Sequence, residues 1–530
     1  SRKKADGSWP SVILLDLMKK YGDRKLRISE NRDVIKPIDF ERALDDRFPF
    51  FDFLKKKKLE IFSSRYNKEL TFLSHHYSHA QVAKYMSPFK KCVILVIDGA
   101  GSKFSDIENT HLDYRKSKEQ NKEIHEESSV YTLIDGKLEC KMKNGQEFFK
   151  SNKFPEHFYS EGIGTCYEKI AEFIFNSKRA SGKVMGLAPF GKDLGHRSSL
   201  ELLNSLDWQK SYRDKSKEDW ESSEYMDLYK NLACTVQRLF EQRLESLLID
   251  IKNQFPEIDN LIIAGGCALN CTSNMKLLNK KIFSEIYIPP FPGDESIGLG
   301  CALHEYYKEN EWKRFEHSEQ QGYFGEERLY DKEIIREKFK DFKIIEPESI
   351  ESFCAELIAD EKIIGWFQGR SESGPRALGN RSILSRMDIK GRKDFLNKSV
   401  KFREPFRPYG ASVLFEKGHT YFEIPENFHN PYMSFAVRVR EKYRNTFNEA
   451  THIDGTSRMQ LVCKEQNEKF YRLIQDVGKL TGVDAILNTS MNVMGEPIVE
   501  TIDDLKGFLK NSNVYGVAIG DIFIEKEGLK

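Results

Sequence analysis

The chain of 530 residues is long enough for two or more domains, and its 39% of hydrophobic residues suffices to build buried cores. A formal net charge of +1 disfavours a protein dedicated to binding nucleic acid or a membrane surface, since such proteins carry a broad basic excess. No apolar run approaches the roughly 18 residues of a membrane helix, and the opening segment SRKKADGSWP lacks the apolar stretch of a signal peptide. Nine cysteines without a CxxC pair indicate reduced thiols and a cytoplasmic protein.

The first half of the sequence alternates short, apolar, β-branched runs with glycine-containing turns and one long segment of helical periodicity. The almost wholly polar stretch 102–129 predicts an excursion loop. The predicted elements are strands at 92–97, 261–264 and 286–288, a hairpin of 130–134 with 137–140, and helices over 225–254 and from about 268. Alternation of this kind is typical of layered α/β proteins.

A charged, irregular stretch separates these elements from a second set. We place a linker at 321–345, between a first domain at 1–320 and a second domain at 346–530. The second set consists of helices at 349–360, near 390–399 and at 466–480, with strands at 363–367, near 411–415, near 433–439 and at 483–487. Both domains are therefore expected to be α/β.

The segment LSHHYSHA places His75 and His79 four residues apart, so that on a helix they share one face and can bind one metal. Asp98 stands where a predicted strand ends, and Asp294 follows another strand in the loop PPFPGDES. Carboxylates at strand ends commonly bind ligands in α/β sheets. Two histidines and two carboxylates suit iron, manganese or zinc; the alternative is a hydrogen-bonded histidine cluster with a structural role. His76 is expected to face away from the other two histidines and to be structural.

The segment GRSESGPRALGNRSIL contains Arg370, Arg376 and Arg381 among glycines, a proline and serines. Glycines let backbone N–H groups approach an oxyanion, and arginine holds it through two parallel hydrogen bonds. Between Arg370 and Arg407, eleven lysine or arginine residues stand against four acidic residues in a nearly neutral chain. A local excess of this kind indicates a site for an anion.

Three further segments could extend this site: Arg403 and Arg407 lie in KFREPFRP, Arg458 lies in a predicted turn, DGTSR, and Ser490 follows a predicted strand. Taken singly, each could instead form a surface ion pair or cap a helix. Together they describe an anion or nucleotide site separate from the metal site.

A pair of glycines, Gly265 and Gly266, precedes Asn270 where a predicted strand gives way to a helix. This arrangement can cradle a nucleotide phosphate at the start of a helix. Paired glycines are also common in turns that bind nothing, so both interpretations stay open.

The most informative motifs are, in chain order, SHHYSHA, VIDGAG, GKVMGLAPFG, GGCALN, PPFPGDES, GWFQGRSESGPRALGNRSIL, VKFREPFRPYGASVL, HIDGTSRMQ and LNTSMNVMGEPIVET. In these motifs the chain resembles the O-carbamoyltransferases of the tobramycin, cephem, novobiocin and nodulation-factor type. The matching segments span nearly the whole chain in one order, which makes the resemblance specific.

The resemblance implies an actin/Hsp70-like (Kae1-like) domain followed by a YrdC-like α/β domain. The second domain would join carbamoyl phosphate to ATP, giving carbamoyladenylate and pyrophosphate. The first would transfer the carbamoyl group to an acceptor hydroxyl with a bound divalent metal, expected to be iron, and magnesium would accompany ATP. The implied partners are carbamoyl phosphate and a hydroxyl-bearing metabolite or sugar, without membrane or nucleic acid, and a homodimer is an expected assembly.

Carried over motif by motif, the resemblance also implies the site residues. The metal ligands, which are also the expected catalytic residues, would be His75, His79, Asp98 and Asp294. The adenylate site beside them would be lined by Gly265, Gly266 and Asn270. The residues binding carbamoyl phosphate and ATP would be Arg376, Lys401, Arg407, Arg458 and Ser490, with Arg370 and Arg403 as further candidates.

The sequence departs from the family pattern at two places. Family chains carry an opening strand and a Gly-x-x-x-His-Asp-Ser segment before the stretch that matches Arg2–Lys4, and neither precedes it here. We expect that this strand and a nucleotide-contacting histidine are either lost or lie outside the given sequence. Ser296 and Gly298 replace the glycine and alanine common after the aspartate, so the loop near Asp294 is expected to differ.

Two other activities fit parts of the pattern. A tRNA threonylcarbamoyladenosine-type modification enzyme would share the same two folds, but would need a wider basic surface than a near-neutral chain provides. A small-molecule kinase of the actin-like fold would not need a second, arginine-rich domain.

Overall fold

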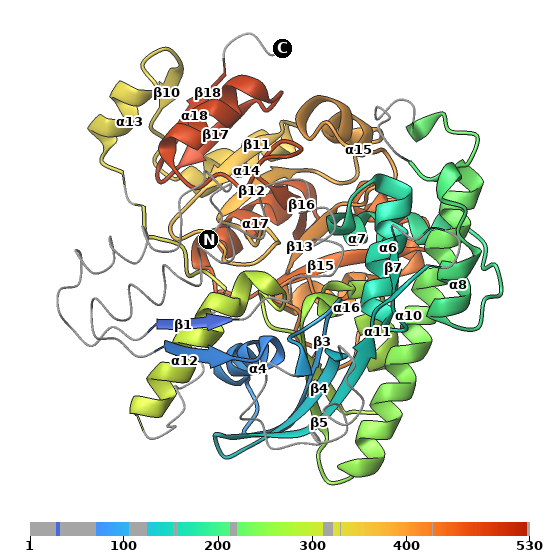
Figure 1. Ribbon diagram of the computed structural model, residues 1–530. Helices are drawn as coiled ribbons and strands as arrows, with labels where there is room; N and C mark the ends of the chain where they lie inside the picture. The colour runs from blue at the N-terminus through green and yellow to red at the C-terminus, as the bar shows by residue number, and fades with distance from the viewer. Residues whose placement is uncertain are drawn as a thin grey trace, which may run out of the picture.

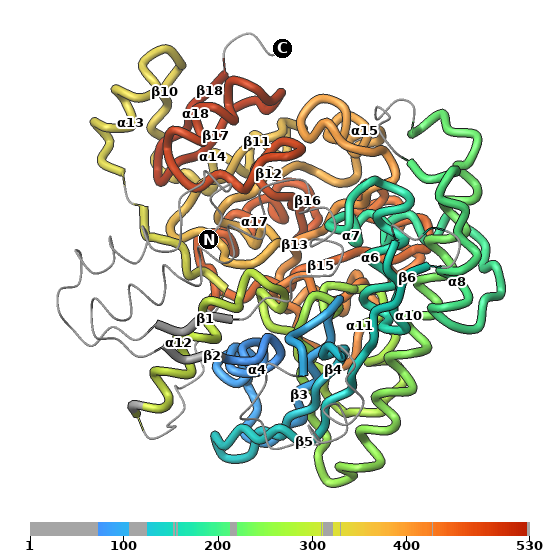
Figure 2. The backbone as a smooth tube through the Cα atoms, viewed as in Figure 1, coloured from blue at the N-terminus to red at the C-terminus, as the bar shows by residue number. Residues whose placement is uncertain are grey.

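The computed structural model describes residues 28–31, 70–104, 124–212 apart from 152, 153, 155 and 156, then 220–310 and 322–526 apart from 329 and 427 (Figures 1 and 2). Figure 1 shows two adjacent halves, the blue-to-green first half mostly below and to the right and the yellow-to-red second half mostly above. Each half is built on one mixed sheet with helices around it. The expected α/β class is therefore confirmed.

The first half centres on a five-stranded sheet with the order β5-β4-β3-β8-β9. β3 pairs antiparallel with β4 and parallel with β8, and β9 adds parallel to β8. Every residue of β3 after its first is buried, which explains its unbroken apolar sequence. The strands of this half are β1 (Ile28–Asn31), β2 (Leu70–Leu73), β3 (Lys91–Ile97), β4 (Ile124–Ile134), β5 (Lys137–Glu147), β6 (Phe149–Lys150), β7 (Phe158–Tyr159), β8 (Asn260–Ala264) and β9 (Glu285–Tyr287).

The predicted hairpin is confirmed in β4 and β5. Its two turn residues both have positive φ, 48° at Asp135 and 83° at Gly136, as the type I′ turn of a tight hairpin requires. Both strands are longer than predicted, because buried polar residues continue the pairing where an apolar pattern ends. Residues 124–129 belong to β4, so the predicted excursion loop is wrong for them, and 105–123 lie outside the described residues.

Helices surround this sheet, and the predicted long helix is confirmed as α10, which buries leucine, valine and phenylalanine side chains at helical spacing. α4, which follows β2 directly, packs against α12. The α-helices of this half are α4 (His75–Met86), α6 (Ile163–Phe175), α7 (Ser181–Leu187), α8 (Ser199–Ser205), α10 (Met226–Gln254), α11 (Cys271–Asn279) and α12 (Ile297–Glu309). Short 3-10 turns are η2 (Lys178–Ala180), η3 (Ala188–Phe190), η4 (Trp208–Lys210), η5 (Gly266–Leu269) and η6 (Asp294–Ser296).

The second half forms a nine-stranded mixed sheet with the order β10-β18-β17-β11-β12-β16-β13-β15-β14. The strands predicted near the observed β11, β13, β14 and β16 are confirmed. β12 and β15 were not predicted, because each begins with polar residues directly after a glycine-containing turn. The strands are β10 (Lys343–Ile345), β11 (Ile364–Phe367), β12 (Arg381–Ser385), β13 (Gly410–Leu414), β14 (Ala436–Arg438), β15 (Thr456–Val462), β16 (Ala485–Ser490), β17 (Gly516–Ile519) and β18 (Ile522–Glu525).

The predicted helices of this half are confirmed as α14, α17 and the short α15, which continues as one π-helical turn, η7. α14 and α17 pack against each other. The helices are α13 (Lys332–Lys338), α14 (Ile350–Ala359), α15 (Arg392–Phe395), η7 (Leu396–Val400), η8 (Phe415–Lys417), α16 (Gly418–Tyr421), η9 (Glu441–Tyr443), η10 (Asn448–Ala450), α17 (Glu468–Thr481) and α18 (Ile502–Asn511).

The stretch expected as a linker, 321–345, is not irregular throughout. It contains α13, and its last residues form β10, which pairs antiparallel with β18. The charged sequence concealed this helix because α13 exposes most of its charged side chains and buries only Ile335. At least the end of this stretch therefore belongs to the second sheet.

The apolar core continues from the first half into the second without interruption. Phe406 of the second half lies against Phe175 and Trp220 of the first, with ring centroids 6.2 and 5.5 Å apart. Lys183 of α7 donates to Glu404 at 2.5 Å. The two halves therefore meet in a packed junction, and the candidate sites lie beside it.

Gly379, in the turn before β12, offers a test of this packing. Its φ is +106°, and a Cβ there would lie 2.2 Å from Cδ1 of Phe470 in α17. Gly379→Ala is expected to lower the free energy of unfolding by about 3 kcal/mol, through backbone strain and overpacking. Gly507→Ala, in the open surface of α18, is expected to raise it by about 0.5–1 kcal/mol. Urea denaturation measures both, and equal effects of the two substitutions would contradict the packing described here.

Candidate metal centre and anion site

His75 and His79 face the same point because α4 begins at His75 and places them one turn apart. Ser74 caps the helix, since its hydroxyl accepts a hydrogen bond from the N–H of Tyr77. The two Nε2 atoms lie 3.3 Å apart. The helix start thus delivers two imidazole nitrogens to one place, as their spacing predicts.

Two carboxylates complete the group. Asp98 follows β3 and Asp294 opens η6 after β9, so both stand at the carboxyl edge of the first sheet, where α/β proteins bind ligands. Asp98 Oδ2 lies 3.4 Å from His75 Nε2 and 3.3 Å from His79 Nε2. Asp294 Oδ1 lies 3.3 and 3.7 Å from the same two atoms. The structure therefore brings together all four of the expected metal ligands.

This geometry fits a metal ion. A tetrahedral site with bonds of about 2.1 Å has ligand–ligand edges of roughly 3.4 Å. The five donor–donor distances between 3.3 and 3.7 Å match these edges. We therefore conclude that the four side chains are disposed to hold one divalent cation, and nitrogen with carboxylate oxygen suits iron, manganese or zinc.

The protonation of these groups supports the same conclusion. Burial opposes the charge of Asp98, but hydrogen bonds with His75 and His79 outweigh it and hold the pKa of Asp98 well below its usual range. Hydrogen bonds with the same histidines lower the pKa of Asp294 to about 2. The side chain of His79 is fully buried whereas that of Asp294 is 74% exposed. The group is therefore open on the Asp294 side, where a substrate can reach it.

A serine behind the group orients one ligand. Ser296 Oγ donates to Gly293 O at 2.8 Å and lies 3.4 Å from His79 Nδ1. A proton on Nδ1 leaves Nε2 free to bind a metal. The hydroxyl that distinguishes Ser296 from the usual family glycine thus supports a ligand.

His76 lies on the other side of α4, as expected. Its Nδ1 contacts Ser129 Oγ at 2.9 Å, and burial, reinforced by Lys143, lowers the pKa of His76 to about 3 although Glu126 opposes it. A neutral, buried histidine of this kind is structural.

The paired glycines bring β8 close to the metal group. Gly265 has φ +88°, and a Cβ on it would lie 2.2 Å from the carbonyl oxygen of Ile97; one on Gly266 would lie 2.9 Å from Asp98 Oδ1. Only glycine fits at both positions. Asn270 caps α11, accepting from Ser273 N–H at 3.1 Å, so part of its amide is used within the fold.

In the second half, Arg376, Arg407 and Arg458 come together although they lie on separate segments. Burial, and then the charge of Arg376, lower the pKa of Arg458 to about 9, and burial also lowers the pKa of Arg376. Among the described residues, neither the Arg376 side chain nor the Arg458 side chain has a hydrogen-bond or ion-pair partner. Arg407 lies 3.7 Å from Glu404. Two buried guanidinium groups that repel each other and have no ion-pair partner are suited to binding an anion.

The prediction placed Arg458 in a turn, and this is wrong. The turn ends at Gly455, with φ +80°, and Arg458 is the third residue of β15. The error arises because DGT is a turn sequence while the apolar part of the strand begins only after the arginine. A position inside a strand fixes the arginine more firmly than a turn would.

Lys401 and Ser490 lie together, and their side chains form hydrogen bonds with each other. Lys401 Nζ donates to Ser490 O at 2.7 Å and to Ser490 Oγ at 3.1 Å, and also to Asn492. Arg403 donates to Asn397 at 2.9 Å and lies over the ring of Tyr409. These contacts join the segment after η7 to the end of β16, beside the arginines.

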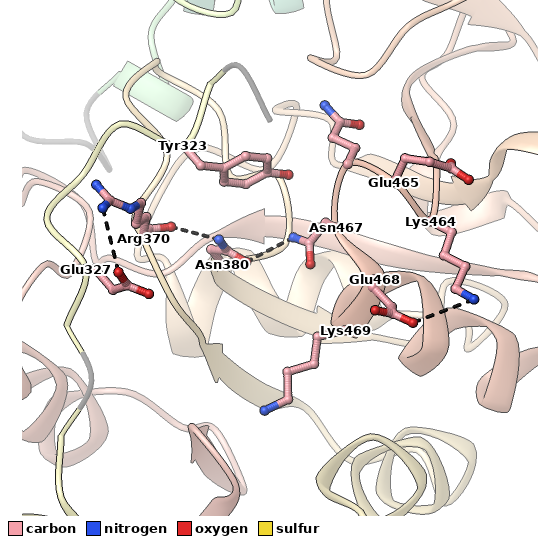
Figure 3. Close-up of a pocket in the computed structure, with 10 residues that line it drawn as sticks. Tyr323, Glu327, Arg370, Asn380, Lys464, Glu465, Asn467, Glu468 and Lys469 are labelled. Carbon is pink, nitrogen blue, oxygen red and sulfur yellow. Dashed lines mark hydrogen bonds and ion pairs between the residues drawn. The ribbon is translucent and has the colours of Figure 1, made fainter. Parts of the chain in front are cut away.

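The three arginines of the glycine-rich stretch lie in three different environments. Arg381 is buried in β12, donates to the carbonyl oxygens of 368, 369 and 380, and lies 3.7 Å above the ring of Phe367. Arg370 is half-exposed and lies 3.6 Å from Glu327, on the wall of a surface pocket of about 630 Å³ (Figure 3). The prediction of one phosphate clamp with three arginines is therefore too broad, and Arg376 alone joins the cluster.

Sequence reasoning missed Glu372, whose hydrogen bonds fix the conformation of this stretch. Its Oε1 accepts hydrogen bonds from the N–H groups of Leu378, Asn380 and Arg381 at 2.7, 2.8 and 3.2 Å. The signal was present as an acidic residue that stands alone among basic ones. The carboxylate closes the loop that carries Arg376.

The two groups of residues meet at the junction of the halves. The charge of Arg376 interacts with Cys271, where α11 begins, and with Glu295, which follows Asp294. A Cβ on Gly374 would lie 2.1 Å from Pro290 O, so the arginine loop packs directly on the loop that leads to Asp294. The arginine cluster and the four candidate metal ligands thus lie on loops that pack against each other.

Comparison with known proteins identifies the family to which the chain belongs. The models named Carbamoyltransferase N-terminus and Carbamoyltransferase C-terminus match residues 40–303 and 355–526. The chain belongs to the carbamoyltransferase family. Among the described residues, no helix has both the length and the apolar character needed to cross a membrane.

The relatives are moderately similar. Nodulation protein NolNO of Sinorhizobium fredii is 33% identical over 474 residues, 86% of this chain but 64% of that protein. The uncharacterized protein MJ1058 of Methanocaldococcus jannaschii is 30% identical over 85% of this chain and 72% of its own length. The 3'-hydroxymethylcephem-O-carbamoyltransferase of Streptomyces clavuligerus is 27% identical over 65% of each chain. Full-length HypF, a solved structure, reaches a TM-score of only 0.29 at 13% identity over 59% of this chain and 44% of its own, which has no weight for the fold.

Proposed function

We propose that the chain is an ATP-dependent O-carbamoyltransferase with one reaction in each half. The observation that carries this proposal is the buried, unpaired side chains of Arg376 and Arg458, where the loop that carries Arg376 packs on the loop that leads to Asp294. A carbamoyltransferase needs a strongly cationic site for its phosphorylated substrates and a second site for an uncharged hydroxyl. Family membership and both groups of residues support this assignment.

In the first reaction, carbamoyl phosphate, ATP and water would give carbamoyladenylate, phosphate and pyrophosphate. The substrates together carry several negative charges, which Arg376, Arg407 and Arg458 can neutralise in a partly buried site. Lys401 and Ser490 hold the adjoining segments in place through their mutual hydrogen bonds. Magnesium is expected with ATP.

In the second reaction, an acceptor hydroxyl would attack the carbamoyl carbon, and AMP would leave. His75, His79, Asp98 and Asp294 would hold a divalent metal, for which iron is our proposal, and such a metal supplies Lewis acidity for carbonyl or hydroxyl groups. The nucleotide would lie beside Asp98 along the backbone of Gly265 and Gly266, where the fold leaves no room for a side chain. The facing loops would keep the water-sensitive adenylate within the molecule between the two reactions.

For the architecture, we propose a Kae1-like domain at 1–320 and a YrdC-like domain at 346–530, connected by 321–345, whose last three residues join the second sheet as β10. The first sheet supports an actin/Hsp70-like assignment, since an antiparallel meander of three strands is extended by two parallel strands. The acceptor we propose is a hydroxyl-bearing metabolite or sugar.

Incubation of the protein with ATP and labelled carbamoyl phosphate tests the proposal. AMP and pyrophosphate are expected only when carbamoyl phosphate is present, because the adenylate cannot form without the carbamoyl group. Mass spectrometry of a metabolite extract added to the reaction is expected to reveal a carbamoylated product. Formation of ADP, or release of pyrophosphate without carbamoyl phosphate, would favour a kinase or another nucleotide-dependent activity.

A further inference from the structure

A fully buried carboxylate, Glu126 of β4, lies beneath the start of the helix that carries the two histidines. Its Oε1 accepts from Ser74 Oγ at 2.7 Å, and its Oε2 accepts from the N–H of His76 at 3.3 Å. Ser74 and His76 stand on either side of the metal ligand His75. One carboxylate therefore holds the first turn of α4 from below.

The same carboxylate also holds the chain segment that leaves Asp98. Glu126 Oε2 accepts from Ser102 N–H at 3.0 Å, and a Cβ on Gly101 would lie 2.6 Å from this oxygen. Ser102 closes the connection, because its hydroxyl accepts from the backbone N–H of His75 at 3.0 Å. The segment after Asp98 and the start of α4 are thus tied to one another through Glu126 and Ser102.

Glu126 is charged because Lys143 of β5 pairs with it in the interior, where the two side chains are 0% and 5% exposed. Burial opposes this charge, but Lys143 and the surrounding hydrogen bonds outweigh burial and lower the pKa of Glu126 to about 2. A buried ion pair adds little to stability for its cost, and its best attested use is to fix a geometry. Here the residues held in place by Glu126 are the neighbours of the candidate metal ligands His75 and Asp98.

We propose that Glu126 is a positioning residue for the metal centre, which sets the separation of His75 and Asp98 through Ser74 and Ser102. The proposal rests on the proposed metal-binding function of the four ligands. Its chemistry requires a carboxylate, because a glutamine amide has only one accepting oxygen and would turn its NH₂ group toward the donors of Ser74, His76 or Lys143. Second-sphere partners of this kind commonly change metal affinity by about 10–100-fold.

The test measures cobalt(II) binding to the complete chain as the dissociation constant against a chromophoric chelator. Glu126→Gln is expected to weaken binding by about 10–100-fold and to alter the visible ligand-field spectrum of bound cobalt, which a general loss of stability would not change. Glu139→Gln is the matched control, since Glu139 pairs with lysines of the same hairpin, Lys137 and Lys141, but lies at the surface. Its affinity and spectrum are expected to equal those of the unaltered protein.

Ser102→Ala provides a milder second variant that removes the acceptor for the His75 N–H while keeping the backbone N–H that Glu126 accepts, and it is expected to weaken cobalt binding by several-fold. An unchanged dissociation constant and spectrum in Glu126→Gln would overturn the proposal. If that variant does not fold, the same result in Ser102→Ala would overturn it. Failure of the unaltered protein and of Glu139→Gln to bind cobalt would instead overturn the metal site itself.

Discussion

Arg376→Ala is expected to lower carbamoyl-phosphate-dependent pyrophosphate release by about 100-fold or more, measured as kcat/KM with a coupled pyrophosphate assay. The reason is that the Arg376 side chain has no hydrogen-bond or ion-pair partner among the described residues and repels the charge of Arg458. Its charge is therefore available to the substrate, whereas Arg407 already lies near Glu404. A smaller but clear loss is expected for Arg407→Ala.

Two comparisons separate a binding role from a structural one. Arg370→Ala, in the same glycine-rich stretch, is expected to leave the rate unchanged because Arg370 is half-exposed and paired with Glu327. The melting temperature of Arg376→Ala is expected to be unchanged or raised, since removal of one of two buried cations relieves their repulsion. Equal rates for Arg376→Ala and the unaltered protein would remove the anion site from this loop.

His79→Ala is expected to abolish carbamoyl transfer and to reduce bound metal from about one ion per chain to nearly none. It should leave pyrophosphate release within about twofold, because the arginine cluster belongs to the other half. His79 is fully buried and contacts both carboxylates and His75, so its removal opens the centre of the group. Metal analysis by mass spectrometry and the two partial reactions measure these effects separately.

His76→Asn is the control for this experiment. It can keep the hydrogen bond to Ser129 and removes no metal ligand, so metal content and transfer are expected to persist. Retention of metal in His79→Ala, or loss of both partial reactions together, would contradict the separation of the two sites.

Local spacing made the grouping of the four candidate metal ligands predictable. An interval of four residues puts two histidines on one helix face, and parallel strands bring Asp98 and Asp294 to the same edge of a sheet. No pattern within a short window could reveal Glu126, which acts on a helix that begins some fifty residues earlier. Contacts between distant segments depend on how the sheet and helix pack, and a single sequence does not record that packing.

The arginines illustrate the same limit. Arg370, Arg376 and Arg381 share one glycine-rich stretch and one composition signal, yet one lies at the surface, one faces the junction and one is buried in β12. Their roles are set by where the chain turns, and Glu372 fixes those turns. The strands β11 and β13 were predictable because each is continuously buried, and β16 because it begins with buried, apolar residues.

The contact between Gly374 and Pro290 also bears on how such enzymes can change over time. A side chain at 374 would occupy the place of a backbone carbonyl in the opposite half, so neither loop can be altered without adjusting the other. If the second half were exchanged for that of a distant relative, the incoming half would need glycine at the position of Gly374 so that its loop could pack against Pro290. The two halves are in this respect a matched pair rather than interchangeable modules.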